Sequence, residues 1–75
     1  MSKYKVCFQN ALKYLLKRDS MSQCFLGWLL CVSQQTISRW CNGVTYPDFN
    51  KLCDLCFIFH VTPDFFFLFD NKNGS

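Results

Sequence analysis

A run of polar side chains between residues 34 and 42 has the types and spacing needed to reach the edges of base pairs. If residues 34–41 form a helix, each residue advances about 100° around its axis. One arc of about 140° then holds the polar side chains, which are Gln34, Gln35, Ser38, Arg39 and Asn42. The opposite side holds Ile37, Trp40 and Cys41. Gln can form two hydrogen bonds with adenine, and Arg can do so with guanine. By itself the pattern fits a DNA-reading helix and an ordinary amphipathic surface helix equally well.

The polar arc must be held at the surface by the rest of the domain. The periodicity of the apolar residues predicts five short helices and no strand. We expect an all-α domain with helices over residues 5–17, 23–30, 34–41 and 49–59, and a fifth beginning at residue 63. Residues suited to N-caps precede the last four helices; they are Ser22, Ser33, Asp48 and Thr62. Asn42 and Gly43 tolerate the left-handed conformation that ends a helix, so the third helix should stop there. One domain over residues 1–70 follows, with a frayed tail over residues 71–75.

Size and charge limit the function classes. A chain of 75 residues has room for one core, which disfavours an enzyme with a roomy pocket. The first eighteen residues carry a charge of +5 and the remainder carries −2, giving +3 in total. A basic end can attract an anionic partner, although a solvated basic surface explains the charge equally well.

The six cysteines could form disulfides, bind a metal or remain as reduced thiols. The chain begins without a signal-peptide pattern, and its longest apolar runs are too short to span a bilayer, so we expect a cytoplasmic protein with reduced thiols and no membrane contact. Cys53 and Cys56 lack a second pair at zinc-binding spacing, so no metal and no cofactor are predicted. A redox switch through Cys24, Cys31 or Cys41 is a less favoured alternative.

A longer pattern surrounds the polar arc. It consists of Met21-Ser22-Gln23, Leu26, Leu30, the run from Val32 to Trp40, Asn42-Gly43 and Tyr46-Pro47-Asp48. This pattern resembles the phage repressor/Cro (Xre-type) helix-turn-helix family, and the likeness extends from Phe8 to Phe67. The resemblance implies a five-helix domain whose 34–41 helix enters the major groove.

The resemblance also assigns roles to individual residues. The positions that match base-reading residues are Gln34, Gln35, Ser38 and Arg39. The positions expected to contact phosphates are Gln23, Thr36 and Asn42, with Lys17 added by the basic first helix. His60 replaces a helix-ending glycine common in relatives, so we expect a left-handed C-cap there.

The second helix departs from the family pattern because it is apolar on all sides, and Gly27 stands where the family prefers Ala. A helix without a polar face is usually buried on more than one side. We therefore expect an exposed apolar patch that binds another chain, made of Leu16, Phe25, Trp28 and Leu29. The alternative is that these apolar side chains are scattered over the surface and bind no partner.

The segment from Phe65 to Phe69 in the last helix is also too apolar for one buried face. Phe66 and Phe69 are expected to pack inward, with Phe65 or Leu68 outside, and many relatives form homodimers through this helix. The favoured hypothesis is a sequence-specific regulator of transcription, a repressor that binds double-stranded DNA as a dimer at the nucleoid. The alternative is a protein-interaction module on the same fold, such as an antitoxin or an accessory subunit.

Overall fold

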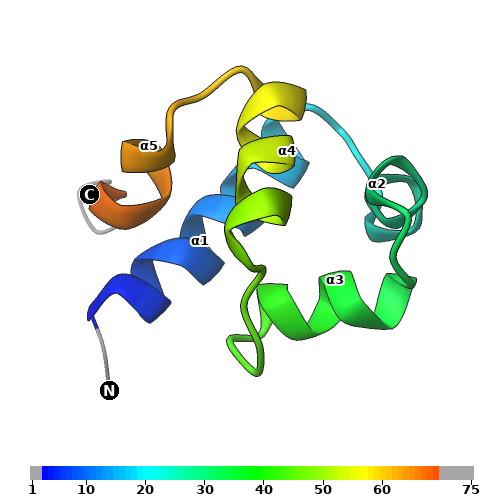
Figure 1. The fold of residues 1–75 in the computed structure, drawn as a ribbon, viewed down its shortest axis with the longest axis horizontal. Coiled ribbons are helices and arrows are strands. Elements are labelled where there is room, and N and C mark those ends of the chain that lie inside the picture. The colour runs from blue at the N-terminus through cyan, green and yellow to red at the C-terminus, as the bar shows by residue number, and fades with distance from the viewer. Residues whose placement is uncertain (1–2, 70–75) are drawn as a thin grey trace.

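The computed structural model describes residues 3–69, which form five α-helices and no strand (Figure 1). The helices are α1 (Lys3–Arg18), α2 (Gln23–Leu30), α3 (Gln34–Cys41), α4 (Phe49–Phe59) and α5 (Pro63–Leu68). The predicted all-α fold is confirmed, and α1 extends beyond the predicted range of residues 5–17 at both ends. The predicted tail over residues 71–75 lies outside the described residues. No helix in the described part of the chain is long and apolar enough to cross a membrane.

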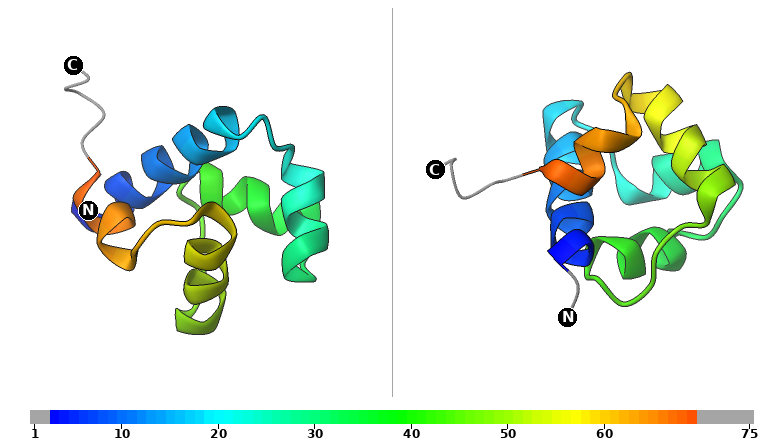
Figure 2. Two further views of the ribbon diagram at one scale, coloured as in Figure 1. Left: turned by 90° about the horizontal axis from the view of Figure 1, so that it is seen from above. Right: turned by 60° about the vertical axis from the view of Figure 1, so that its left-hand side comes forward.

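Helix α1 packs against both α5 and α3. In Figure 1, α2 and α3 form one side of the molecule, α5 lies at the other side, and α4 lies between them. Figure 2 shows α4 projecting away from α1, so that one side of α4 lies at the outside of the molecule. Because α2 packs mainly against α3, these two helices form a distinct unit at one end of the domain.

Most of the predicted N-caps form. The side chains of Ser22, Ser33 and Asp48 accept hydrogen bonds from the backbone N–H groups of Phe25, Thr36 and Lys51, at 3.0, 3.1 and 2.9 Å. Thr62 occupies the N-cap position of α5, but its side chain makes no capping bond. Thr62 is therefore the N-cap residue as predicted, without the side-chain bond, and the Phe65 N–H donates to the backbone carbonyl of Thr62 at 3.0 Å.

The core is built from the inward faces of all five helices. Its fully buried large side chains are Leu12, Leu15, Leu26, Ile37, Leu55, Phe59 and Phe66. The ring of Phe8 joins the two ends of the chain, because its centroid lies 5.2 Å from that of Phe66 and 5.8 Å from that of Tyr46. Burial of these side chains supplies the main stabilisation of the fold.

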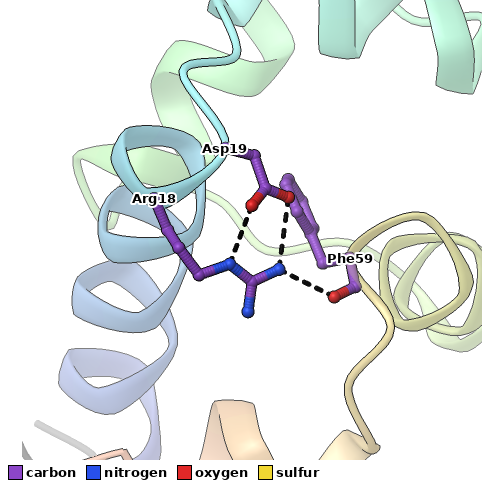
Figure 3. Close-up of polar contacts among 3 residues, drawn as sticks. All are labelled: Arg18, Asp19 and Phe59. Atoms are coloured by element: carbon purple, nitrogen blue, oxygen red, sulfur yellow. Dashed lines mark hydrogen bonds and ion pairs between the residues drawn. The ribbon is translucent and has the colours of Figure 1, made fainter.

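Two cationic side chains close the carbonyl ends of neighbouring helices. Lys51 Nζ on α4 donates to the carbonyl oxygen of Leu30 at the end of α2, at 2.8 Å. Arg18 Nη2 at the end of α1 donates to the carbonyl oxygen of Phe59 at the end of α4, at 2.9 Å (Figure 3). The last carbonyls of a helix lack partners within the helix, and positive charge is favourable there. These bonds therefore connect α1 to α4 and α4 to α2.

Replacing Lys51 tests the connection between α4 and α2. Lys51→Met keeps the apolar stem and removes the donor to Leu30, so we expect the free energy of unfolding to fall by about 1 kcal/mol. Urea denaturation followed by circular dichroism measures this change. Lys17→Met is the matched control, because Lys17 is exposed and its loss should shift the value by less than about 0.5 kcal/mol. Equal effects of the two substitutions would contradict the assignment.

Candidate nucleic-acid interface

The turn between α2 and α3 is held by backbone and capping bonds. Cys31 ends α2 in the left-handed conformation, with φ 60° and ψ 40°. The N–H of Val32 then donates to the carbonyl of Gly27 at 2.9 Å, and Ser33 caps α3. The turn thereby sets α3 at a defined angle to α2.

Gly27 allows this turn to approach α2 closely. A Cβ atom at position 27 would lie 2.8 Å from the carbonyl oxygen of Val32, which is backbone and cannot rotate away. The glycine, which departs from the alanine of the family pattern, therefore has a steric role in this chain.

The two faces of α3 separate as its spacing predicts. Ile37, Trp40 and Cys41 are buried. The four side chains expected to read bases lie on the other face: Gln34, Gln35 and Arg39 are exposed and Ser38 is half-buried. Gly43, with φ 74°, follows directly after the helix and its C-cap, as expected from the Asn42-Gly43 pair.

Arg39 is free to meet an anionic or hydrogen-bonding partner. Within the described residues, the ion pair that forms joins Arg18 to Asp19, at 2.8 Å, and no carboxylate is paired with Arg39. The bond from Arg18 also lowers the pKa of Asp19, so this pair neutralises itself at neutral pH. Of the two basic residues that end α1, Arg18 therefore has a structural role while Lys17 remains exposed.

An open hollow of 720 Å³ lies beside the polar face of α3. It is lined by residues from α1, from the start of α2 and from the end of α3, including Lys13, Lys17, Ser22, Gln23 and Asn42. Three of the four predicted phosphate contacts, Lys17, Gln23 and Asn42, thus meet in one place. Thr36 lies elsewhere, in the first turn of α3, where its hydroxyl is 3.0 Å from Ser33 Oγ.

The electrostatics of this hollow favour an anion. The first turn of α2 contains no acidic residue, and the N-terminus of a helix carries partial positive charge. Lys13 and Lys17 stand one turn apart on α1 and add two full charges. The sequence analysis did not assign Lys13 a role, although its spacing of four residues from Lys17 places both on one helix face.

Asn42 links the hollow to the base-facing side of α3. Its side-chain amide donates to Ser38 Oγ at 3.4 Å, while the same residue lines the hollow. The exposed polar face of α3 and the basic hollow are therefore continuous.

The predicted apolar patch is only partly exposed. Leu16 is 8% exposed and belongs to the core, so the expectation that it lies at the surface is wrong. Leu16 follows Leu12 by one helical turn and therefore shares its inward face. Phe25, Trp28 and Leu29 are exposed, and the rings of Phe25 and Trp28 stack with centroids 5.9 Å apart.

The last helix offers less apolar surface than its composition indicates. Phe66 is buried, and Phe65 and Phe69 are half-buried because both rings pack against Tyr14. Leu68 is exposed. The sequence analysis did not single out Phe49 and Phe57 on α4, although both rings are exposed.

The cysteines differ in accessibility. Cys24, Cys31 and Cys53 are exposed, whereas Cys41 is buried beneath the hollow. Burial raises the pKa of the Cys41 thiol, and nearby Lys13 and a hydrogen bond with Gln23 only partly oppose this effect. His60 ends α4 with φ 59°, which is the left-handed cap expected for it. No group of three metal-ligating side chains meets within residues 3–69.

The short α2, its tight turn and the two-faced α3 define a helix-turn-helix protein. The family described as Helix-turn-helix matches residues 12–66, and the chain belongs to this Xre/Cro-like family. The family is one of DNA-binding regulators of transcription and is typically non-enzymatic. Comparison with curated proteins and with solved structures found no match.

Thiol labelling tests the burial of Cys41. At pH 7.5 we expect a water-soluble maleimide to modify Cys24, Cys31 and Cys53 in the folded protein and to leave Cys41 unmodified. Burial keeps the reagent from the Cys41 thiol, and its raised pKa further lowers the fraction of reactive thiolate. Mass spectrometry of peptides identifies the modified sites, and labelling in urea is the control in which Cys41 reacts. Rapid modification of Cys41 in the folded protein would contradict its burial and would favour the alternative in which Cys41 acts as a redox switch.

Proposed function

We propose that the protein binds specific sequences in double-stranded DNA and regulates transcription, with α3 lying in the major groove. The observation that carries this proposal is the continuity between the exposed polar face of α3 and the basic hollow, through Asn42. Sequence-specific binding needs contacts to bases, which determine the sequence that is bound, and contacts to phosphates, which position the protein on the duplex. The two adjoining surfaces have the chemistry for these two tasks.

In this proposal the residues of α3 read bases and the residues of the hollow hold the phosphate backbone. Gln34, Gln35, Ser38 and Arg39 contact base edges. Lys17, Gln23 and Asn42 contact phosphate, joined by Lys13. Thr36, in the first turn of α3, is proposed as a further backbone contact.

We further propose that the protein is a repressor that binds a short palindrome as a homodimer in the cytoplasm, at the nucleoid. Two-fold symmetry would place two copies of α3 in successive major grooves, about 34 Å apart. The described chain measures 31 × 25 × 18 Å, so two copies at this spacing would lie side by side. Phe65 and Leu68 on α5 are the contacts that the family resemblance proposes for this dimer.

Selection of binding sites from random duplex DNA tests the proposal directly. We expect an enriched palindrome, with affinity that falls steeply as salt increases, because each phosphate contact releases counterions. The double variant Gln35→Ala, Arg39→Ala is the control and should enrich no motif. Absence of enrichment with the folded wild-type protein would overturn the DNA-reading function.

Arg39 should specify one base pair. Truncation in Arg39→Ala removes the guanidinium that can form two hydrogen bonds with guanine, so affinity for the selected site should fall by about 1–3 kcal/mol. Competition binding against all four bases at each position should show relaxed preference at a single position. Uniform weakening on every sequence would instead identify Arg39 as a phosphate contact.

Lys17 should contribute to DNA affinity independently of the base sequence. Lys17→Gln is expected to weaken binding equally on specific and random DNA and to reduce the slope of log affinity against log salt by about 1. Lys17→Arg keeps the charge and should keep the slope. A change in base preference, or an unchanged slope, would remove Lys17 from the phosphate contacts.

A second function is favoured by the exposed side chains of Phe25, Trp28 and Leu29 on α2. We propose, as the alternative, that this patch binds a partner protein, as in an antitoxin or an accessory subunit. Adjacent exposed aromatic side chains are enriched at protein interfaces. Trp28→Ser would then abolish partner binding while leaving any DNA binding intact, which affinity measurements on the same preparation can distinguish.

A further inference from the structure

The outer side of α4 carries an apolar stripe that no other part of the described chain covers. Phe49, Cys53 and Phe57 follow each other at intervals of four residues and therefore lie on one helix face. Phe49 is 73% exposed, Phe57 is 81% exposed, and the Cys53 thiol is exposed between them. We call these three residues the α4 stripe.

The α4 stripe differs from the other apolar surfaces of the molecule. Phe25 and Trp28 on α2 stack on each other, and Phe65 and Phe69 on α5 pack against Tyr14. Neither Phe49 nor Phe57 stacks on an aromatic ring among the side chains that the structure describes. On α5, Leu68 is 73% exposed but stands beside the half-buried Phe65 and Phe69.

The spacing of the stripe allows its two aromatic residues to meet across a two-fold axis. Phe49 and Phe57 lie at equal distances before and after Cys53. If two copies of α4 pack antiparallel about a two-fold axis at Cys53, each Phe49 meets Phe57 of the partner subunit. In such an isologous contact one patch is complementary to itself. The small Cys53 at the centre allows the two helices to approach closely.

The area of the stripe fits the centre of a dimer interface. An aromatic side chain contributes about 200 Å², so the exposed parts of Phe49 and Phe57 amount to roughly 300 Å² in each copy. A standard interface buries about 800 Å² per partner, with an apolar centre and a polar rim. Asn50 and Asp54, which are exposed beside the stripe, supply polar groups for that rim.

We propose that a second copy of this chain docks on the α4 stripe, with the two-fold axis passing beside Cys53. The inference rests on the proposed homodimer and places its contact on α4, where the family resemblance proposes α5. Packed helices have axes about 8–10 Å apart, and Cα atoms lie about 2.3 Å from each axis. Facing Cys53 Cα atoms would then be about 3.4–5.4 Å apart, a range that overlaps the separation needed for a disulfide.

Disulfide trapping tests the position of the axis. The starting variant carries Cys24→Ser and Cys31→Ser, which removes the other thiols that are exposed in the described chain. Copper phenanthroline with dissolved oxygen removes two electrons and two protons from a pair of thiols as the S–S bond forms. We expect a covalent dimer on a non-reducing gel within minutes at tens of micromolar protein. Adding Cys53→Ser should abolish it, and persistence of the dimer after that change would overturn the proposal.

Matched charge substitutions separate α4 from α5. Phe57→Glu and Leu68→Glu change side chains of similar exposure on the two helices. Sedimentation equilibrium should show self-association weakened at least tenfold by Phe57→Glu and less than twofold by Leu68→Glu, with circular dichroism confirming that both variants fold. The reverse order would assign the dimer to α5.

Site selection distinguishes failure of the dimer contact from failure of the proposed function. A wild-type protein that stays monomeric at several hundred micromolar, and gives no covalent dimer, would overturn docking on α4 even if it enriched a DNA motif. A dimer trapped through Cys53 without any enriched motif would leave docking on α4 intact and overturn the DNA-reading function.

Discussion

The burial of Ile37 and Trp40 determines which side of α3 the solvent meets. Both side chains lie against the rest of the domain, so α3 cannot rotate about its axis without exposing large apolar surfaces. Gln34, Gln35 and Arg39 are presented outward as a direct consequence. The orientation of the polar face is therefore supported by the core and needs no dedicated bonds among the polar side chains.

Positive charge serves two separate purposes around this core. Arg18 and Lys51 are directed at backbone carbonyls and hold helix ends together. Lys13 and Lys17 line the open hollow, where they raise the local potential. The net charge of only +3 thus understates the basic character of the surface beside α3. Asp19 is paired with Arg18, and the other acidic residues lie later in the chain, so none of them neutralises Lys13 or Lys17 by a salt bridge in the described residues.

Local signals in the sequence predict most of the fold. Ser22, Ser33 and Asp48 predict the starts of three helices, and in the structure each of these residues is the N-cap of its helix. The polar arc of α3 follows from a single helical period. Leu16 and Thr62 differ from what the sequence analysis predicted: Leu16 shares the inward face of Leu12, one helical turn earlier, and Thr62 occupies the N-cap position without a side-chain capping bond.

The role of Gly27 and the exposure of Phe57 also depend on tertiary contacts. Gly27 is a weak helix former in isolation, and only the approach of Val32 shows why a side chain is disfavoured there. Phe57 has the same hydropathy as the buried Phe59 two residues later. The helix period separates the two rings, but only the packing of α4 decides which of them faces inward.

The pairing of the two terminal helices has a consequence for how the protein is made. The α2–α3 contacts are local in sequence, whereas α1 packs on α5, and Phe8 meets Phe66 near the other end of the chain. Local contacts form early in folding, and long-range contacts must wait until the intervening chain is available. During synthesis the helix-turn-helix unit can therefore assemble while the core is still open. The α1–α5 contact forms only once α5 is available, so a chain without α5 leaves the side of Phe8 that meets Phe66 uncovered, and exposed apolar surface of this kind favours aggregation.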